Sequence, residues 1–487
     1  MPAIITNKFR VHNSEQFRES FTETAGNTYY LSIGRPMPYA TASRPDNRTE
    51  NEGTDASPIT PTDTENTQNF TYDDMLAAKK IDSSNISIVI PRRNWTTGTV
   101  YDYYRHDYGD YLTGTTTANT GNSGAATLFD ATFYVLTSAR NVYKCLDNNG
   151  NAQSTVEPTG TSTSILSLAD GYKWKYMYTL SASQQANFLS TDFMAVSTNS
   201  TVSAAAVDGA INICKIKTAG SGGTDGTFTG IPIRGDGTGA IATVVVSSGA
   251  VTSVTMTSVG SGYTYGYLPN AKIVSNGSTN LTGAEIDVII EPKGGHGFNA
   301  VEELGGFFIM LNASLEGTES ANSGDVTVAN DFRKVALLKD PKTSGNASTA
   351  TTMRATKAIK LSGVSGTFQA DEKITQATTN AVGKVVEWDA TNSILYYVQT
   401  RFLNEGVDTD GSKNAFSTNA TVTGATSSAT GNPDTSHSAT TNNVVFASGY
   451  ATAEIDSGSG QVLYVENRAP ITRAADQTEN IKLIVEF

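Results

Sequence analysis

The most regular alternation of apolar and polar positions lies in the final stretch of the chain, residues 461–487. Val462–Val465 forms a short apolar run. After it, apolar residues recur at every second position: Ile481, Leu483, Val485 and Phe487. This period is typical of a strand with one buried face. Because chain ends fray unless a sheet holds them, we expect this last strand to close a sheet whose other strands lie far away in the sequence.

A break is expected between the two runs. Asn467–Pro470 separates them, and Pro470 has a fixed φ and no backbone N–H. The residue before a proline is also restricted to extended geometry. The end of the chain is therefore predicted to form a strand, a turn and a second strand.

The same kind of pattern predicts strands along most of the chain. Runs of β-branched and aromatic residues that are bounded by Gly, Pro or Asn are typical of strands. They occur at Thr28–Ile33, Ile86–Ile90, Thr132–Leu136, Val142–Leu146, Gly171–Tyr178, Ile241–Val246, Val251–Met256, Gly306–Leu311, Val335–Leu338 and Ile394–Val398.

Only two or three short helices are predicted. Asn13 and Gln16 have the spacing of a capping box ahead of an amphipathic stretch. Tyr72–Lys80 is predicted to be a second helix, and residues 181–196 are predicted to contain a third. Residues 41–69 are polar with little to bury, so we expect an exposed loop there.

Composition supports an all-β fold with few short helices. The chain has 487 residues, enough for several domains, with 38% hydrophobic and only 17% charged residues. Its 21 Tyr and 18 Phe suit strands. The balance of low charge and many small polar residues is more typical of β-rich structural proteins than of helical enzymes.

Charge and cysteine content exclude several classes of partner. A net charge of −13 argues against binding nucleic acid or an anionic membrane through a general basic field. Cys145 and Cys214 make no disulfide framework, which favours folding in a reducing compartment. The sequence shows neither a transmembrane-length apolar run nor a signal-peptide pattern.

Three motifs resemble binding sites but lack a required part. Gly235–Gly239 has no following Lys-Ser/Thr, so a β-turn is predicted instead of a phosphate loop. His106, Asp107 and Asp110 have no further ligand at metal-site spacing. Asp408–Lys413 resembles a calcium loop but lacks the closing Glu. We therefore predict no metal and no cofactor.

No catalytic residues are predicted either. The carboxylate pairs Glu302-Glu303 and Asp371-Glu372 are interpreted as surface charge, because nothing in the sequence provides them with partners. Cys145 lies within a predicted strand and is interpreted as a small buried hydrophobe.

Two groups of residues are candidates for contacts between domains or with a partner. Arg92, Arg93 and Trp95 follow a predicted strand, and they could form an ion pair at a domain joint or an interface anchor. A second group crowds the turn before the last strand: Arg468, Arg473 and Asp476, together with Glu479. A local set of salt bridges and a contact surface are both consistent with this second group.

Several of these stretches carry a family resemblance. They are Asn7–Arg10, Tyr30–Arg35, Val89–Trp95, Val142–Leu146, Asp170–Tyr176, Phe332–Val335, Asp340-Pro341, Tyr464–Ile471 and Asp476–Glu479. In order and approximate spacing the chain resembles the baseplate wedge subunits of T-even-type contractile-tailed bacteriophages. The resemblance covers roughly residues 1–200, 296–345 and 445–487, and the remaining segments look like inserted β modules.

The resemblance implies a structural role without catalysis. Family members are all-β proteins whose N- and C-terminal segments share one domain, so we expect a multi-domain β-sandwich protein. The predicted parts are a core domain of residues 1–90, 296–345 and 445–487, a second domain of residues 91–204, and inserted modules at 205–295 and 346–444. The family also implies a homodimer that joins other wedge proteins in the virion tail baseplate, assembles in the host cytoplasm and rearranges on tail contraction.

Two alternative functions make different demands on the chain. A receptor- or glycan-binding tail protein would use exposed aromatic residues of the inserted modules, for which the candidates are Tyr263, Tyr265, Tyr267 and Trp388. A polysaccharide depolymerase would need two carboxyl groups facing each other across a groove.

Overall fold

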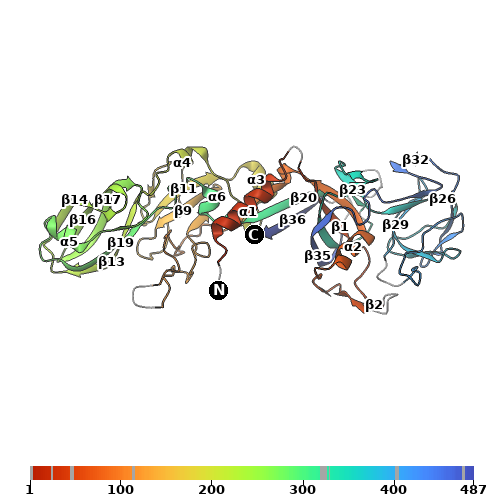
Figure 1. Cartoon of the computed structure of the whole chain (residues 1–487), viewed down its shortest axis with the longest axis horizontal. Coiled ribbons are helices and arrows are strands. Elements are labelled where there is room, and N and C mark those ends of the chain that lie inside the picture. The colour runs from red at the N-terminus through yellow and green to blue at the C-terminus, as the bar shows by residue number, and fades with distance from the viewer. Residues whose placement is uncertain are drawn as a thin grey trace. The chain divides into compact units, whose positions relative to one another are not determined.

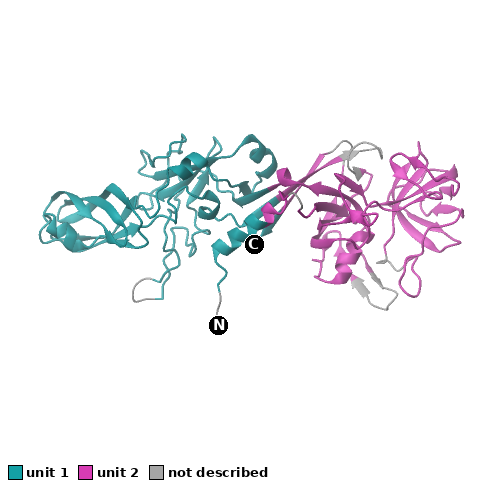
Figure 2. Cartoon of the chain, turned by 45° about the horizontal axis from the view of Figure 1, so that its top comes forward, with its two compact units in different colours: residues 1–16, 87–310, 484–487 teal, residues 17–86, 311–483 magenta. Residues whose placement is uncertain are grey.

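A computed structural model confirms an all-β chain with few short helices (Figure 1). The structure describes residues 4–23, 26–43, 49–111, 116–318, 326–327, 329–400, 405–473 and 478–487. The chain divides into two compact units, which are distinguished by colour in Figure 2. Unit 1 comprises residues 1–16, 87–310 and 484–487, and unit 2 comprises residues 17–86 and 311–483. The predicted four-part division stays a prediction.

Unit 2 contains a five-stranded sheet built from segments that are far apart in the sequence. Its order is β25 (Thr352–Arg354), β6 (Met75–Ile81), β1 (Tyr29–Gly34), β22 (Phe332–Lys339) and β35 (Gln461–Ile471). All six residues of β1 are buried, because β1 lies in the middle of the sheet. Tyr30 pairs with Leu338 on one side and Lys80 on the other, so residues far apart in sequence share one antiparallel ladder.

The predicted break at Asn467–Pro470 is wrong, because β35 includes these residues. The strand continues through Pro470 to Ile471. Its ladder with β22 is irregular at this point, since Lys334 pairs with Asn467 but Phe332 pairs with Ile471. A proline without an N–H is tolerated here because β35 is the last strand of the sheet.

The predicted helix at Tyr72–Lys80 is wrong. The helix α2 spans Glu65–Asp73 and is capped by the Thr64 side chain, and β6 begins at Met75. The residues Met75–Ala78 favour helix by propensity, but all four are buried between β1 and β25. Tertiary pairing therefore overrides local preference. The predicted loop at 41–69 contains four short strands and the beginning of α2, although most of its described side chains are exposed.

A second, seven-stranded sheet of unit 2 is built from strands that lie between residues 357 and 451. Its order is β29 (Ile394–Val398), β28 (Ala381–Asp389), β27 (Lys373–Gln376), β30 (Val422–Gly424), β31 (Thr430–Pro433), β26 (Lys357–Ser365) and β34 (Tyr450–Ala451). An additional pairing of β29 with β26 joins non-adjacent members of this order. Ile359, Ile374, Leu395 and Val422 belong to its buried core.

Short hairpins and one 3₁₀ turn complete unit 2. They are β2 (Thr41–Ser43) with β3 (Thr49–Asn51), β4 (Gly53–Thr54) with β5 (Ser57–Pro58), β23 (Lys342–Thr343) with β24 (Asn346–Ala347), β32 (Thr440–Thr441) with β33 (Val444–Val445), and the turn η1 (Ser83–Asn85).

Unit 1 contains a four-stranded sheet with an aromatic core. Its order is β10 (Leu166–Ser167), β11 (Lys173–Thr179), β9 (Asn141–Asp147) and β8 (Tyr134–Leu136). Trp174 is fully buried and stacks on Tyr172, with Tyr101 against its edge. Three short helices accompany the sheet: α3 (Ala182–Phe188), α4 (Ser200–Ala204) and α6 (Ala300–Glu303).

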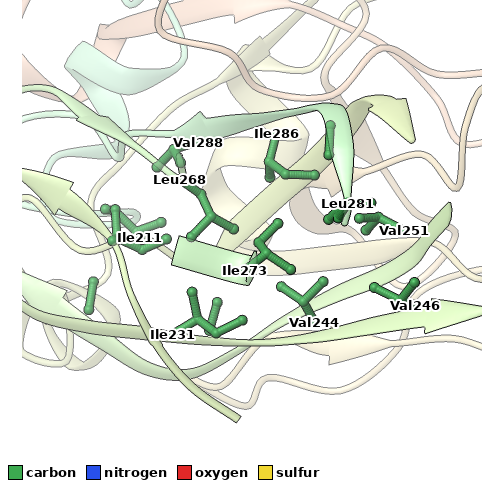
Figure 3. Close-up of a cluster of buried hydrophobic side chains, with 14 of the residues drawn as sticks. Ile211, Ile231, Val244, Val246, Val251, Leu268, Ile273, Leu281, Ile286 and Val288 are labelled. Atoms are coloured by element: carbon green, nitrogen blue, oxygen red, sulfur yellow. The ribbon is translucent and has the colours of Figure 1, made fainter. Parts of the chain in front are cut away.

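Residues 211–290 of unit 1 form a module with its own core (Figure 3). Its strands are β13 (Ile213–Ser221) with β19 (Thr282–Ile289), β14 (Gly226–Pro232) with β16 (Thr238–Ser247) and β17 (Ala250–Ser261), and β15 (Arg234–Gly235) with β18 (Gly266–Tyr267). Every second residue of β16 from Ala240 to Val246 is buried, as period-two patterning requires. The short helix α5 (Asn270–Ser275) contributes Ile273 to the same core.

The first helix, α1, begins earlier than predicted. It spans Asn7–Glu19, and the hydroxyl of Thr6 accepts a hydrogen bond from the Phe9 N–H. Thr6 therefore provides the N-cap hydrogen bond that the sequence pattern had suggested for Asn13. Because the capping motif lies further along the helix, it does not mark the helix start.

The C-terminal strand closes a sheet with distant partners, as predicted. β36 (Thr478–Glu486) pairs with β20 (Phe308–Thr318). β20 follows β7 (Ile86–Pro91) and β12 (Phe193–Ala195) in sheet order and also pairs with β21 (Val326–Thr327). Within the described part of the chain, every helix is too short or too polar to cross a membrane.

Candidate functional site: a buried polar joint and a C-terminal clamp

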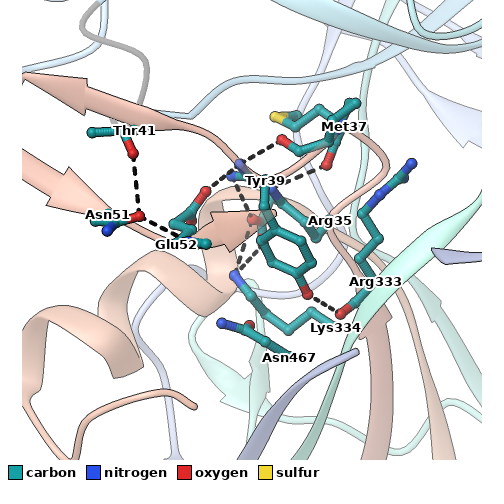
Figure 4. A network of polar contacts seen from close by, with 12 residues as sticks. Arg35, Met37, Tyr39, Thr41, Asn51, Glu52, Arg333, Lys334 and Asn467 are labelled. Atoms are coloured by element: carbon teal, nitrogen blue, oxygen red, sulfur yellow. Dashed lines mark hydrogen bonds and ion pairs between the residues drawn. The ribbon is translucent and has the colours of Figure 1, made fainter. Parts of the chain in front are cut away.

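A buried arginine organises the polar centre of unit 2 (Figure 4). Arg35 follows β1, has a positive φ of 60° and is fully buried. Its guanidinium donates to the Met37 and Pro38 carbonyls at 3.1 and 2.9 Å and contacts the Glu52 carboxylate. We call Arg35, Tyr39, Glu52, Asp74 and Lys334 the Arg35 network.

Asp74 is the second charged centre of the Arg35 network. Both of its carboxylate oxygens accept from Lys334 Nζ at 3.0 Å, and Arg35 Nη1 lies 3.6 Å away. The Asp74 carbonyl also accepts from the Arg35 N–H at 2.8 Å. Because Asp74 and Lys334 are both buried, each charge depends on the other for compensation.

A second ion pair extends from the same strand. Arg333 donates to both carboxylate oxygens of Asp55, at 3.1 and 3.0 Å. Burial acts to raise the pKa of Asp55, but hydrogen bonds from Arg333 and from the Tyr39 N–H outweigh it, so the pKa is lowered. The pair therefore holds residues 52–59 against β22 through a charged carboxylate.

The hydroxyl of Tyr39 fills the irregularity between β22 and β35. It donates to the Arg333 carbonyl and accepts from the Arg468 N–H at 3.0 Å. Asn467 meanwhile donates through its side chain to the Ile59 carbonyl at 3.0 Å. One tyrosine thus satisfies backbone groups on two strands where their own ladder is interrupted.

Because of Glu52, the stability of the Arg35 network is predicted to depend on pH. Burial, opposed by Arg35, raises the pKa of Glu52 from 4.5 to about 7. The folded state therefore binds a proton that the unfolded state releases between these two values. Stability from this group is fully present below pH 4.5 and is lost as the pH rises through about 7. Over that window we expect a slope of up to about 1.4 kcal/mol per pH unit.

Urea unfolding of wild type and Glu52→Gln between pH 5 and 8 checks this expectation. The difference in unfolding free energy between the two proteins should change with pH in the stated direction. Glu65→Gln, which alters an exposed carboxylate of the same unit, is the matched control and should track wild type. Parallel curves for wild type and Glu52→Gln would contradict the assignment.

The other residues predicted near the chain's end lie in different settings. The Arg468 side chain is exposed and lies 3.8 Å from Glu466. Its backbone N–H donates to the Tyr39 hydroxyl of the Arg35 network. Arg473 is buried and pairs with Glu479 at 2.5 Å while also contacting the Thr327 carbonyl. Asp476 lies outside the described residues.

Arg92, Arg93 and Trp95 bind groups within unit 1. Arg92 donates to the Ser190 carbonyl at 2.7 Å. Arg93 donates to the Phe129 carbonyl at 2.8 Å, and its guanidinium lies 4.6 Å from the Tyr134 ring centre. Trp95 Nε1 donates to the Ser154 hydroxyl at 3.1 Å. These contacts fix the segment after β7, and a role in partner binding stays a prediction.

A clamp that sequence reasoning missed holds the C-terminus of unit 1. Arg10 of α1 contacts the Phe487 carbonyl oxygen and the Glu486 carboxylate, and its guanidinium lies 3.6 Å from the Phe307 ring centre. The Phe487 N–H donates to the Phe307 carbonyl at 3.0 Å. Nothing local in Asn7–Arg10 indicates a partner so distant in sequence, so only the fold identifies the clamp.

Two carboxylates predicted to be surface charge are buried. Glu303 is 6% exposed and pairs with Lys144. Glu372 is 4% exposed and accepts backbone N–H bonds from Gln369, Thr426 and Ser427 at 2.7–3.0 Å. Both corrections have the same cause: Lys144 reaches Glu303, and Thr426 and Ser427 reach Glu372, from distant segments that a pair of adjacent acids does not reveal.

The remaining predicted motifs are accounted for by local structure. Within residues 235–239, only Asp236 and Gly237 connect β15 to β16, and Asp236 accepts from the Thr264 N–H at 2.9 Å. His106 accepts from the Ile290 N–H at 3.3 Å, and Asp410 accepts from the Ser412 N–H at 2.9 Å. Across the described ranges, no group of His, Cys, Asp or Glu is arranged to hold a metal ion. Cys145 is fully buried, as predicted.

The four aromatic candidates for glycan binding separate into two pairs. Tyr263 is buried in the module core, and Trp388 packs on Phe368 with ring centres 5.4 Å apart. Tyr265 and Tyr267 are 59% and 53% exposed.

The clamp joins Arg10 to Phe487, and the Tyr39 hydroxyl accepts from the Arg468 N–H, so both contacts bring together segments from the two ends of the chain. These end segments match a known family. Residues 3–149 and 416–487 match the family model described as bacteriophage T4 Gp8. This match confirms the predicted resemblance to a class of phage baseplate wedge subunits.

A named relative agrees with the family match. The chain is 26% identical over 209 residues to the baseplate wedge protein gp8 of Enterobacteria phage T4. The aligned part is 40% of this chain and spans 60% of the relative's length.

Proposed function

We propose that this chain is a structural component of the baseplate wedge of a contractile-tailed bacteriophage. The supporting observation is that the two matched segments, though separated by residues 150–415, meet within each unit. In unit 1, Arg10 of the first segment contacts Phe487 of the second. In unit 2, β1 and β35 flank the same strand, β22. This arrangement is expected if the matched segments form a common body and the intervening residues include additions to it.

The mechanism is mechanical rather than catalytic. Large interfaces hold neighbouring wedge proteins together, and some of them repack when the baseplate changes state. The proposed location is the tail baseplate. The residues proposed as partner contacts or as parts of a domain joint are Arg92, Arg93, Trp95, Arg468, Arg473 and Asp476.

We further propose that the chain acts as a homodimer. A two-fold contact is the commonest arrangement of homo-oligomers. Ile5 lies just before α1 and Phe9 lies in its first turn, and these apolar side chains are 70% and 55% exposed. Such apolar surface gains stability when a second copy covers it.

Measurements on the purified chain, alone and with other tail proteins, test both proposals. Light scattering coupled to size exclusion should give twice the mass of the chain, and co-expression with the phage's other wedge proteins should yield a stoichiometric complex. Phe9→Ser should weaken the dimer, whereas Tyr111→Ser, which alters a more exposed aromatic residue, should not. A monomer that joins no tail protein would contradict the proposal.

A glycan contact by the inserted module is a finer proposal, and it rests on the exposed pair Tyr265 and Tyr267. A glycan array probed with the whole chain and with a Tyr265→Ser, Tyr267→Ser double variant tests it, because only the wild type should bind.

A further inference from the structure

A lysine and a glutamate form a buried contact in the core of unit 1. Lys144 lies in β9 and Glu303 ends α6, and their side chains are 0% and 3% exposed. Lys144 Nζ is 2.6 Å from Glu303 Oε2. The same Nζ lies 4.3 Å from the centre of the Tyr104 ring, which keeps the amine in place.

The Glu303 carboxylate is held by more than the lysine. Its other oxygen, Oε1, accepts from the Gly297 N–H at 2.8 Å and from the Asn299 N–H at 3.2 Å. Two backbone N–H groups converging on one oxygen have the arrangement that stabilises an oxyanion at a carbonyl carbon.

A histidine, His296, lies near the second carboxylate oxygen of Glu303, Oε2. His296 Nδ1 is 3.9 Å from Glu303 Oε2, and the ring is buried edge-on to Tyr104 with ring centres 4.8 Å apart. The His296 N–H donates to Glu291 at 2.8 Å, which fixes the backbone beneath the ring. His296 also lines a cavity of about 310 Å³, into which a small product can leave.

We propose that Lys144 and Glu303 condense into an intramolecular isopeptide bond. The ammonium and the carboxylate together contain the atoms of one amide and one water, so the reaction needs no further reactant. Nζ first passes a proton to Oε2, and the neutral amine then attacks Cδ while negative charge develops on Oε1 between the two backbone N–H groups. A second proton moves from Nζ through His296 to Oε2, the Cδ–Oε2 bond breaks, and water leaves.

The setting favours this reaction over a permanent ion pair. Two buried charges are costly even when paired, and a neutral amide removes both. Burial lowers the pKa of Lys144 despite the opposing effect of Glu303, which eases formation of the neutral amine. Burial acts to raise the pKa of Glu303, but Lys144 and His296 outweigh it and the pKa is lowered, so the close contact of the two groups has to drive the proton transfer. Groups held in contact by a rigid fold react with effective molarities of roughly 10⁵–10⁸ M in favourable cases.

The bond would bracket the inserted module. It joins β9 to α6, and residues 205–295 lie within the loop that it closes. Closing a long loop restricts the unfolded chain and so stabilises the folded one. A role of the bond in resisting mechanical force during tail contraction depends on the proposed function. The existence of the bond does not depend on it.

Mass spectrometry of the intact native protein tests the proposal directly. The measured mass should be one water below that of the sequence, and tryptic digestion should give a branched peptide that joins Lys144 to Glu303. Lys144→Arg keeps the charge but should restore the full sequence mass. His296→Gln should slow formation of the branched peptide in freshly made protein.

Three results would overturn it: the full sequence mass in wild type, water loss that persists in Lys144→Arg, or linear peptides only. If Lys144→Arg does not fold, the branched peptide of the wild type still decides the question. Because none of these measurements depends on assembly, failure of the bond and failure of the baseplate role are distinguishable.

Discussion

Removal of Ile481–Phe487 is expected to prevent the chain from folding. The deletion takes away most of β36, which pairs with β20 and buries Leu483. It also leaves Arg10 without its contacts to Glu486 and Phe487. Native proteins are stable by only about 5–15 kcal/mol, so the loss of a paired strand and a terminal clamp is expected to exceed the margin.

The measurement is the yield of soluble protein and its thermal unfolding by circular dichroism. Deletion of Phe487 alone is the matched control, because its side chain is partly exposed and the rest of β36 remains. The control should fold with a lowered melting temperature. A soluble truncated chain that melts like wild type and still assembles would show that β36 is not required.

Asp74→Ala is expected to have the second-largest effect. Asp74 is 2% exposed and accepts from Lys334 through both oxygens, with Arg35 close by. Its removal leaves the buried Lys334 ammonium without the carboxylate that accepts its hydrogen bonds. Breaking a buried ion pair from one side typically costs about 3–5 kcal/mol.

Urea unfolding of unit 2 provides the measurement, and Glu466→Ala provides the control. Glu466 and Arg468 lie 3.8 Å apart with side chains 37% and 42% exposed, and exposed pairs contribute about 0–1 kcal/mol. Equal destabilisation by both substitutions would contradict the view that burial of the Arg35 network makes it important.

The sequence predicts strands well where the pattern itself records burial. β1, β9 and β22 lie close to their predicted positions because their apolar runs are bounded by turn residues. The final strand was also placed correctly, since alternation through Leu483 requires a buried face. Such periodic signals survive because tertiary packing acts in the same direction as the local pattern.

Local pattern fails where a distant partner decides the outcome. Met75–Ala78 would suit a helix, yet pairing with β1 and β25 makes it a strand. The sequence around Glu303 predicts a surface carboxylate, but the fold places Lys144 beside it in the core. Arg35 is followed by Pro36 and Pro38. Nothing in its sequence context predicts the contacts with Asp74 and Glu52, because the fold and not the sequence spacing brings these residues together.

The resemblance to the family supplied what the residues alone could not. Patterning predicts a β-rich protein without obvious catalytic chemistry, which fits many structural proteins. The matched ends of the chain, and their meeting at the C-terminal clamp and around β22, connect that general picture to one class of tail protein. Residues 150–415 lie outside the match, so the modules they contain are where this chain is expected to differ in its neighbours.

The most direct test of the proposed function is a reconstruction of the complete tail of the phage that encodes this chain. We expect density for the chain in the baseplate wedge, present as two-fold pairs, with residues 3–149 and 416–487 in contact with neighbouring wedge proteins. Density in the capsid or the tail tube, or absence of the chain from the virion, would contradict it.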